Sequence, residues 1–408
     1  MKPTGLGDPL VLPCGATVKN RILKSAMSET LGTPTHAPQP GLSTLYRRWA
    51  EGGLGVSVTG NVMIDARALG EPGNVVIEDD RDLAALSDWA AAGSANGTHL
   101  WMQLNHPGKQ SPKFLSPETV SPSAIGFGPT LARAFAVPRA LEEPEIEDLV
   151  VRFGRSAGIA VKAGFTGVQI HGAHGYLVSQ FLSPRHNERT DGWGGPLENR
   201  ARFLRAILAE IRRQVGGSVP VSVKMNSADF QKGGFGHDES LQVMKWLQDD
   251  GIDLIEISGG TYEAPAMAGA VKKSTSEREG YFLDFVSQAK ASLEVPLCVT
   301  GGFRTPAGMR GAIEEGAHMV GLARTLCVQP DFPARVLAGE DVVSAVHRLS
   351  TGVKAVDLVA MLDVTWYENQ LGRMAAGQDP LVDMSAWRSL ATTVWSTGLQ
   401  AFRMRRAR

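Results

Sequence analysis

The chain has 408 residues, 43% of them hydrophobic, with a formal net charge of -1. This length exceeds the roughly 250 residues of a typical (β/α)8 barrel, so one large domain with insertions and a tail can be accommodated. A charge near zero gives no electrostatic reason to expect a nucleic-acid partner, and no run approaches the ~20 apolar residues that a membrane span needs.

The N-terminus and the cysteines indicate an unexported protein. The first eight residues lack the apolar core of a signal peptide. Three cysteines, Cys14, Cys298 and Cys327, are scattered along the chain, so neither a disulfide framework nor a zinc or iron–sulfur ligand set is indicated. We therefore expect a cytoplasmic protein.

Strand-type and helix-type patterns alternate along the chain, which is typical of a parallel sheet wrapped by helices. The expected strands are Ile22–Ala26, Leu54–Thr59, His99–Leu104, Val168–Ile170, Val219–Lys224, Leu254–Ser258, Leu297–Thr300 and Met319–Leu322. The expected helices are Ser43–Glu51, Leu83–Ala92, Ile146–Ala163, Asn199–Val215, Glu239–Asp250, Phe282–Leu293 and Pro306–Glu315. These elements predict an α/β fold, a (β/α)8 TIM barrel over residues 1–340. A doubly wound open sheet is the alternative, but its Gly-rich turn is missing after the first strand.

Two segments exceed what a barrel needs. Residues 105–145, after the third strand, are rich in Pro, Gly and Ser, and we expect a loop insertion that covers the site as a lid. Residues 341–408 contain helix formers with apolar spacing around Val353–Leu371, which predicts a helical C-terminal extension. This extension can cap the barrel, contact a partner subunit in a homo-oligomer, or both.

A cluster of polar rings follows the fourth expected strand. His171, His174 and Tyr176 lie on a Gly-punctuated turn, and the C-terminal ends of barrel strands form the mouth where catalytic side chains collect. Two imidazoles can donate to one oxygen, and a nearby phenol can give a proton to a neighbouring carbon. The pattern predicts a site that polarises a carbonyl. A metal site is the first alternative, although no third ligand is evident, and satisfied core histidines are the second.

Glycine turns follow the seventh and eighth expected strands, where barrels commonly bind phosphate through backbone N–H groups. These turns contain Gly301–Gly302 and Gly321–Arg324. Either turn alone could be ordinary, but their placement after consecutive late strands favours a phosphate site, with Arg324 suited to a dianion.

Long motifs in the chain resemble the Old Yellow Enzyme family of FMN-dependent ene-reductases. The resemblance covers roughly residues 8–340. It is carried by His171–Pro184, Asn187–Arg200, Arg21–Ser28, Gly55–Asn61, Met102–Gly108, Val223–Asn226 and the two late glycine turns.

The resemblance implies an FMN across the barrel mouth, with its phosphate at Gly301, Gly302, Ala323 and Arg324. It places Ser25, Ala26, Met27 and Ser28 along one edge of the flavin, Gly60 and Gln103 at its pyrimidine, and Lys224 near that ring. A fixed ammonium there stabilises the anion of the reduced flavin, and Gln103 can accept from a ring N–H while donating to a ring carbonyl. No metal is implied.

The implied reaction has two halves, in which NADPH or NADH gives hydride to FMN and an α,β-unsaturated carbonyl compound then receives it. His171 and His174 hold the carbonyl oxygen, Tyr176 protonates the α-carbon, and Thr30 stands where some members have a substrate-contacting tyrosine. Ala26 and Ser28 depart from the usual Pro and from the usual Cys or Thr.

Three other functions are weighed against this one. A related FMN barrel enzyme would carry out dehydrogenation or demethylation of amines or N-methylated compounds, although its larger members carry Cys-ligated clusters. A flavoprotein reducing tRNA uridines would need a basic surface, which the charge balance does not provide. A non-enzymatic scaffold would leave a costly polar cluster at the mouth without use.

Overall fold

The computed structural model describes residues 5–116, 118–264, 279–280, 282–347, 349–353, 356–357 and 361–395. Parallel strands close into a barrel, because β14 pairs with β3 at one seam and β10 pairs with β7 at another. The eight barrel strands are β3 (Ile22–Lys24), β4 (Val56–Val58), β7 (His99–Asn105), β10 (Gly167–Gly172), β11 (Val221–Asn226), β12 (Leu254–Ser258), β13 (Leu297–Thr300) and β14 (Met319–Leu322). The predicted (β/α)8 barrel is confirmed, with strand ends that differ by a few residues.

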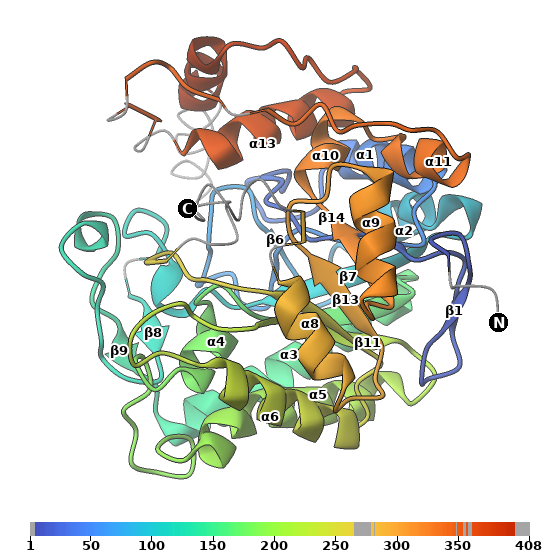
Figure 1. Cartoon of the computed structure of the whole chain (residues 1–408). Helices are drawn as coiled ribbons and strands as arrows, with labels where there is room; N and C mark the ends of the chain where they lie inside the picture. The colour runs from blue at the N-terminus through green and yellow to red at the C-terminus, as the bar shows by residue number, and fades with distance from the viewer. Residues whose placement is uncertain are drawn as a thin grey trace.

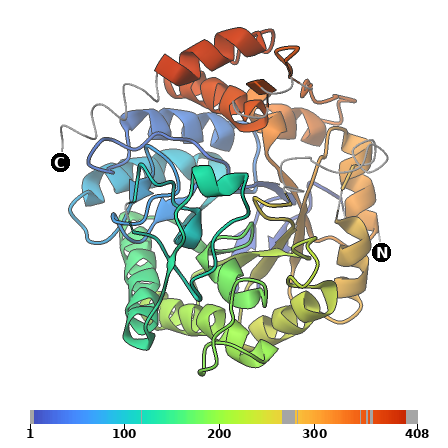
Figure 2. The same ribbon diagram turned by 90° about the vertical axis from the view of Figure 1, so that its left-hand side faces the viewer.

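Amphipathic helices surround the barrel (Figures 1 and 2). The longest, α3, begins with a capping box between Glu142 and Glu145 and ends at Gly164, whose φ of 103° suits glycine. The helices between the barrel strands are α1 (Pro40–Glu51), α2 (Leu83–Gly93), α3 (Glu143–Ala163), α5 (Leu197–Val215), α6 (His237–Asp249), α8 (Leu283–Lys290) and α9 (Pro306–Glu314). All seven predicted helices are present.

Several short elements were not predicted from the sequence, because two to six residues are too few to show a periodic pattern. An antiparallel hairpin of β1 (Leu10–Val11) and β2 (Thr17–Val18) packs apolar side chains against the barrel core. Strand β5 (Val62–Met63) joins β7 and β6 (Val75–Val76) beside the barrel, and the short helix α4 (Leu177–Leu182) follows β10 directly.

The insertion after β7 is a loop-rich segment with two short parallel strands, β8 (Val120–Ser121) and β9 (Arg139–Ala140). Two 3-10 turns, η2 (Gly108–Gln110) and η3 (Leu131–Arg133), precede and follow β8. In Figure 2 this segment lies in front of the barrel. Its Lys109 is buried, with Nζ 4.3 Å from the centre of the Phe127 ring. The insertion is therefore a folded, loop-rich segment, and its role as a lid over the site stays a prediction.

The C-terminal part folds back onto the first helix of the barrel. After α10 (Arg324–Val328) and α11 (Phe332–Leu337), helix α13 (Leu362–Ala375) packs against α1 and α10 (Figure 1). Trp366 is buried in this interface and donates from Nε1 to the carbonyl of Met384, at 2.8 Å. The helix predicted around Val353–Leu371 is confirmed where the structure describes this stretch, since residues 356–357 and 362–371 are helical, and residues 354–355 and 358–360 lie outside the described residues.

The proposed division into a barrel of residues 1–340 and an extension of residues 341–408 stays a prediction. Residues 396–408 of that extension lie outside the described residues. Among the helices of the described part of the chain, none is both long and apolar enough to cross a membrane.

Candidate active site

The three polar rings predicted from the sequence come together at the C-terminal end of β10. The ring centres of His171 and His174 are 5.1 Å apart, and those of His171 and Tyr176 are 4.8 Å apart. The backbone turns sharply after β10, where His174 has a φ of 62° and Gly175 a φ of 80°. The amide of His174 donates to Oδ1 of Asn226 at the end of β11, which holds this turn in place.

Both histidines are neutral donors or acceptors rather than cations. Burial, together with the nearby Lys224 ammonium, holds the pKa of both imidazoles well below their ordinary value. The Ala173 amide donates to Nδ1 of His171, at 3.3 Å, so the proton of that ring sits on Nε2 and can be given to a ligand. Nε2 of His174 lies 2.8 Å from the Ser258 hydroxyl, so this ring donates from Nδ1 when Ser258 donates to Nε2.

Tyr176 forms a phenol pair with Tyr262, whose hydroxyl oxygen lies 2.9 Å away. Burial, followed by the effects of Tyr262 and Glu71, raises the pKa of Tyr176 well above its ordinary value, and burial raises the pKa of Tyr262 to about 12. Tyr176 therefore holds its proton at neutral pH, as a proton donor must.

The barrel interior beneath these rings is polar. Gln103 is wholly buried and donates from Nε2 to Gln169 Oε1 at 2.8 Å, while its Oε1 has no partner. The ammonium of Lys224 donates to the Ser25 hydroxyl at 2.6 Å and lies 3.1 Å from Oε1 of Glu256. The structure thus brings the predicted residues Ser25 and Lys224 into contact.

The segment that follows β3 carries the next three predicted residues. Ala26 packs against the inner core, and the sulfur of Met27 lies 3.4 Å from that of Cys327. The Ser28 hydroxyl is 2.5 Å from a carboxyl oxygen of Glu71 and 2.6 Å from one of Glu368 on α13. A helix from the C-terminal extension therefore reaches the predicted flavin edge.

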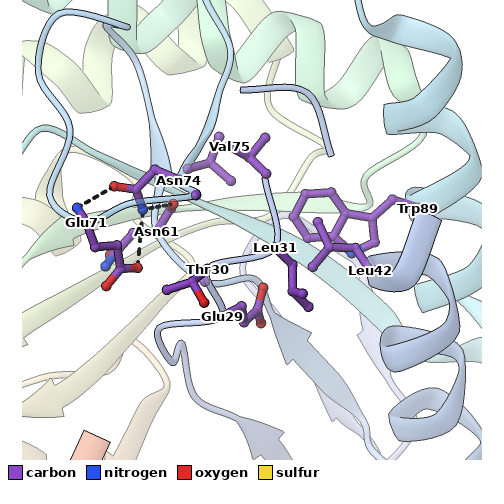
Figure 3. Close-up of a pocket in the computed structure, with 12 residues that line it drawn as sticks. Glu29, Thr30, Leu31, Leu42, Asn61, Glu71, Asn74, Val75 and Trp89 are labelled. Atoms are coloured by element: carbon purple, nitrogen blue, oxygen red, sulfur yellow. Dashed lines mark hydrogen bonds between the residues drawn. The ribbon is translucent and has the colours of Figure 1, made fainter. Parts of the chain in front are cut away.

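A small pocket lies behind this segment, with a volume of about 20 Å³, enough for one water molecule (Figure 3). Thr30 lines it, with a φ of 53°, opposite Asn74 and Glu71. Gly60 also lines it, and its amide donates to the Tyr46 hydroxyl at 3.1 Å. That N–H group therefore already has a partner, and the predicted contact of Gly60 with a flavin stays a prediction.

The two late glycine turns lie side by side. Strands β13 and β14 are neighbours, with Thr300 opposite Gly321, so Gly301 and Gly302 begin one turn next to the turn that contains Ala323 and Arg324. Gly302 has a φ of 74°, a conformation that favours glycine. The guanidinium of Arg324 lies 5.9 Å from the Tyr367 ring of α13, a second contact from the C-terminal extension to the predicted site.

Comparison with known proteins identifies the family of the chain. The model of one family, described as NADH:flavin oxidoreductase / NADH oxidase, matches residues 7–341. The chain belongs to this family. The resemblance to the Old Yellow Enzymes is thereby confirmed.

Curated relatives of this family member carry similar names. The chain is 38% identical to "NADH-dependent flavin oxidoreductase iliE" of Hypocrea jecorina (strain QM6a), over 88% of this chain and 95% of that protein. It is 36% identical to "NADH-dependent flavin oxidoreductase nadA" of Aspergillus parasiticus, over 83% and 80% of the two chains. The chain is therefore related to NADH-dependent flavin oxidoreductases over most of its length.

Solved structures share the fold of this oxidoreductase. A 2-naphthoyl-CoA reductase matches with a TM-score of 0.78 and 27% identity, over 84% of this chain but only 54% of that one. The Old Yellow Enzyme homologue of Zymomonas mobilis matches with a TM-score of 0.71 and 24% identity, over 84% and 95% of the two chains, which shows the fold.

The family uses FMN and a nicotinamide co-substrate, and the interior of the barrel fits the flavin. The free, buried Oε1 of Gln103 needs a donor, and the pyrimidine ring of a flavin presents an N–H between two carbonyl groups. Among the described residues, no group of three or more His, Cys, Asp or Glu side chains could hold a metal ion.

Sequence reasoning missed several residues of this site. Gln169 and Glu256 are polar residues within otherwise apolar buried strands, a signal that could have identified them. Glu71 and Glu368 carry no such signal, because one lies in a loop and the other on a helix more than three hundred positions from Ser28.

Proposed function

We propose that this oxidoreductase reduces the C=C bond of α,β-unsaturated carbonyl compounds, using hydride that a nicotinamide supplies through FMN. The observation that carries the proposal is the grouping of two neutral imidazoles and a protonated phenol, in which the ring centre of His171 lies 5.1 Å from that of His174 and 4.8 Å from that of Tyr176. Bound FMN supplies the hydride; the residues of the chain supply polarisation and a proton.

The two imidazoles act on the carbonyl oxygen of the substrate. Nε2–H of His171 is available because Nδ1 already accepts from the Ala173 amide. Hydrogen bonds to the oxygen draw electron density from the β-carbon and favour hydride addition there. Because both rings are neutral, the carbonyl is polarised by hydrogen bonding and is not protonated outright.

Tyr176 gives the proton to the α-carbon. Its hydroxyl stays protonated at neutral pH, and the Tyr262 hydroxyl, 2.9 Å away, fixes its position and can hydrogen-bond the oxygen that remains. The burial that raises the pKa also makes a tyrosinate costly, so Tyr176 must regain its proton before the next turnover.

We further propose NADH as the hydride donor, since the relatives described above are named NADH-dependent. Steady-state rates with NADH and NADPH at equal concentration test this choice. A higher kcat/KM with NADPH would overturn it.

The function is tested with purified protein under anaerobic conditions. FMN-loaded protein should be bleached by NADH and recoloured by 2-cyclohexenone, with saturated cyclohexanone as the product. Protein that is bleached but not recoloured by any member of an enone panel would contradict the proposal while leaving the flavin assignment intact.

A paired variant separates the histidines from the flavin. His171→Ala combined with His174→Ala should abolish the charge-transfer band of bound phenols and slow enone reduction, while bleaching by NADH continues. His99→Ala is the matched control. His99 is the first residue of β7, so it lies at the end of the barrel away from the site, where it contacts the Thr17 carbonyl. Phenol binding that survives the double substitution would refute the donor role.

One observation favours a second candidate, the oxidation of amines or N-methylated compounds. The carboxyl groups of Glu71 and Glu368 share the Ser28 hydroxyl and lie close enough to Tyr262 to affect its pKa, and the one of the pair that is ionised would suit a cationic substrate beside the aromatic rings. A histamine dehydrogenase from Rhizobium sp. 4-9 shares the fold, with a TM-score of 0.73 and 25% identity, over 83% of this chain and 48% of that one. Flavin reduction by amines without any enone turnover would favour this candidate.

A further inference from the structure

A buried carboxylate lies at the centre of the polar barrel interior. Glu256 on β12 is wholly buried, and its Oε1 accepts from the hydroxyls of Ser25, at 2.5 Å, and Thr300, at 2.7 Å. The same oxygen lies 3.1 Å from Nζ of Lys224, and Oε2 accepts from Gln169 Nε2 at 2.9 Å. Burial alone would raise the pKa of Glu256, but Lys224 and these donors hold it below its ordinary value. The group is therefore a carboxylate.

From this geometry we propose that Glu256 is a positioning residue for the flavin, which fixes the orientation of the Gln103 amide and offsets the charge of Lys224. The proposal concerns the cofactor site of the family and does not depend on which substrate is reduced.

The orientation follows from a chain of two amides. A carboxylate only accepts, so the side of Gln169 that faces Glu256 must be its NH2 group. Gln169 then presents Oε1 to Gln103, so Gln103 must donate to it from its own NH2 group, 2.8 Å away. Gln103 is left with a free Oε1 and one remaining N–H, and this Oε1 is the buried atom without a partner.

A single charged group thus determines what the pyrimidine edge of the flavin encounters. The pyrimidine N–H of the flavin requires an acceptor, and Gln103 presents one without having to choose between two amide orientations. With a neutral amide at position 256, both amides could rotate, and Gln103 could then present its NH2 group instead.

The charge of Lys224 is also offset. The ammonium is buried, with 3% of its surface exposed, and lies against the carboxylate, so the pair carries no net charge. The resemblance found in the sequence implied that a fixed ammonium at Lys224 stabilises the anion of the reduced flavin. The ion pair weakens that effect, because the carboxylate repels the same anion that the ammonium attracts.

The test compares three variants of the FMN-loaded protein by anaerobic equilibration with reference dyes. Glu256→Gln leaves Lys224 uncompensated, and we expect the equilibrium constant for flavin reduction to rise at least tenfold, about 30 mV for a two-electron couple. Lys224→Met should shift the midpoint in the opposite direction. The double variant Lys224→Met/Glu256→Gln is again neutral and should return to within about threefold of the wild-type constant, about 15 mV.

Two further variants separate the effect of charge on the flavin midpoint from the effects of packing and of the Gln103 orientation. Thr300→Val removes a hydrogen bond to the same carboxylate without a change of charge, so its midpoint should match the wild type. Gln169→Leu removes the hydrogen-bonded link between Gln103 and Glu256. FMN should then bind at least tenfold more weakly in a fluorescence titration, while the midpoint potential of the bound flavin should not change.

The outcomes decide between the possibilities even if one single variant fails to fold. A double variant whose midpoint equals that of Lys224→Met would show that Glu256 contributes no charge at the flavin and would overturn that half of the proposal. Unchanged FMN affinity in Gln169→Leu would overturn the orienting half. A midpoint shift in Thr300→Val as large as that in Glu256→Gln would show that packing, not charge, is responsible.

Discussion

Replacing Glu368 by glutamine is expected to stabilise the protein at alkaline pH. Ser28 has one hydroxyl proton, yet its oxygen lies 2.5 Å from one carboxyl oxygen of Glu71 and 2.6 Å from one of Glu368. Two such short contacts need two protons, so one carboxyl group must itself be protonated. Burial, followed by repulsion from Glu368, raises the pKa of Glu71 to about 8. The folded protein therefore holds a proton that the unfolded chain releases near pH 4.5.

The direction and size of the effect follow from this difference. A pKa that is raised by folding gives a contribution that is complete below the unfolded pKa and is lost as the pH rises through the folded pKa. Well between pH 4.5 and 8 the slope for one proton is about 1.4 kcal/mol per pH unit, but Glu71 is half titrated at pH 8, so the free energy of unfolding falls by about 1 kcal/mol between pH 7 and 8. In Glu368→Gln the amide can donate to Ser28 and Ser28 to Glu71, so no second proton is needed and this loss becomes smaller.

The assay is urea unfolding of the FMN-loaded protein at pH 7 and pH 8, followed by circular dichroism. We expect the free energy of unfolding of Glu368→Gln, relative to wild type, to increase by about 1 kcal/mol between these two pH values. Glu340→Gln is the matched control, since Glu340 is an exposed partner of Arg335 and its replacement should change the difference by less than about 0.5 kcal/mol. A variant that loses stability relative to wild type as the pH rises would refute the shared proton.

Three further outcomes are expected. Tyr176→Phe should slow enone turnover by about 10²- to 10⁴-fold while flavin reduction by NADH, followed by stopped-flow absorbance, stays unchanged; equal slowing of both halves would contradict its role as proton donor. Arg324→Leu should weaken FMN binding by about 10- to 100-fold but leave riboflavin binding unchanged in a fluorescence titration, because the lost contact is to phosphate. Gly321→Ala should destabilise the fold by about 1–3 kcal/mol in urea unfolding, since its Cβ would lie 1.8 Å from Thr300 Oγ1; a neutral result would mean that Thr300 moves freely.

The sequence predicted the barrel well because each strand is a short apolar run and each helix has a regular apolar face. It also placed His171, His174 and Tyr176 together, since these residues are close along the chain and follow one strand. Sequence position does not specify hydrogen-bond partners, however. The occupied amide of Gly60 depends on Tyr46 of helix α1, and the contact of His174 depends on Ser258 of another strand, β12.

The charge balance of the flavin site shows most clearly what the sequence could and could not provide. Lys224 was predicted as a fixed cation near the flavin, and the parallel register of β11 and β12 places it directly beside Glu256. A carboxylate in the middle of a buried strand is too costly to be left without partners, so its presence in Leu254–Ser258 indicates a nearby cation or several donors. Strand order then limits the choice to neighbours such as Lys224. The approach of Glu368 to Ser28 follows no comparable rule, because it depends on how the C-terminal extension packs against the barrel.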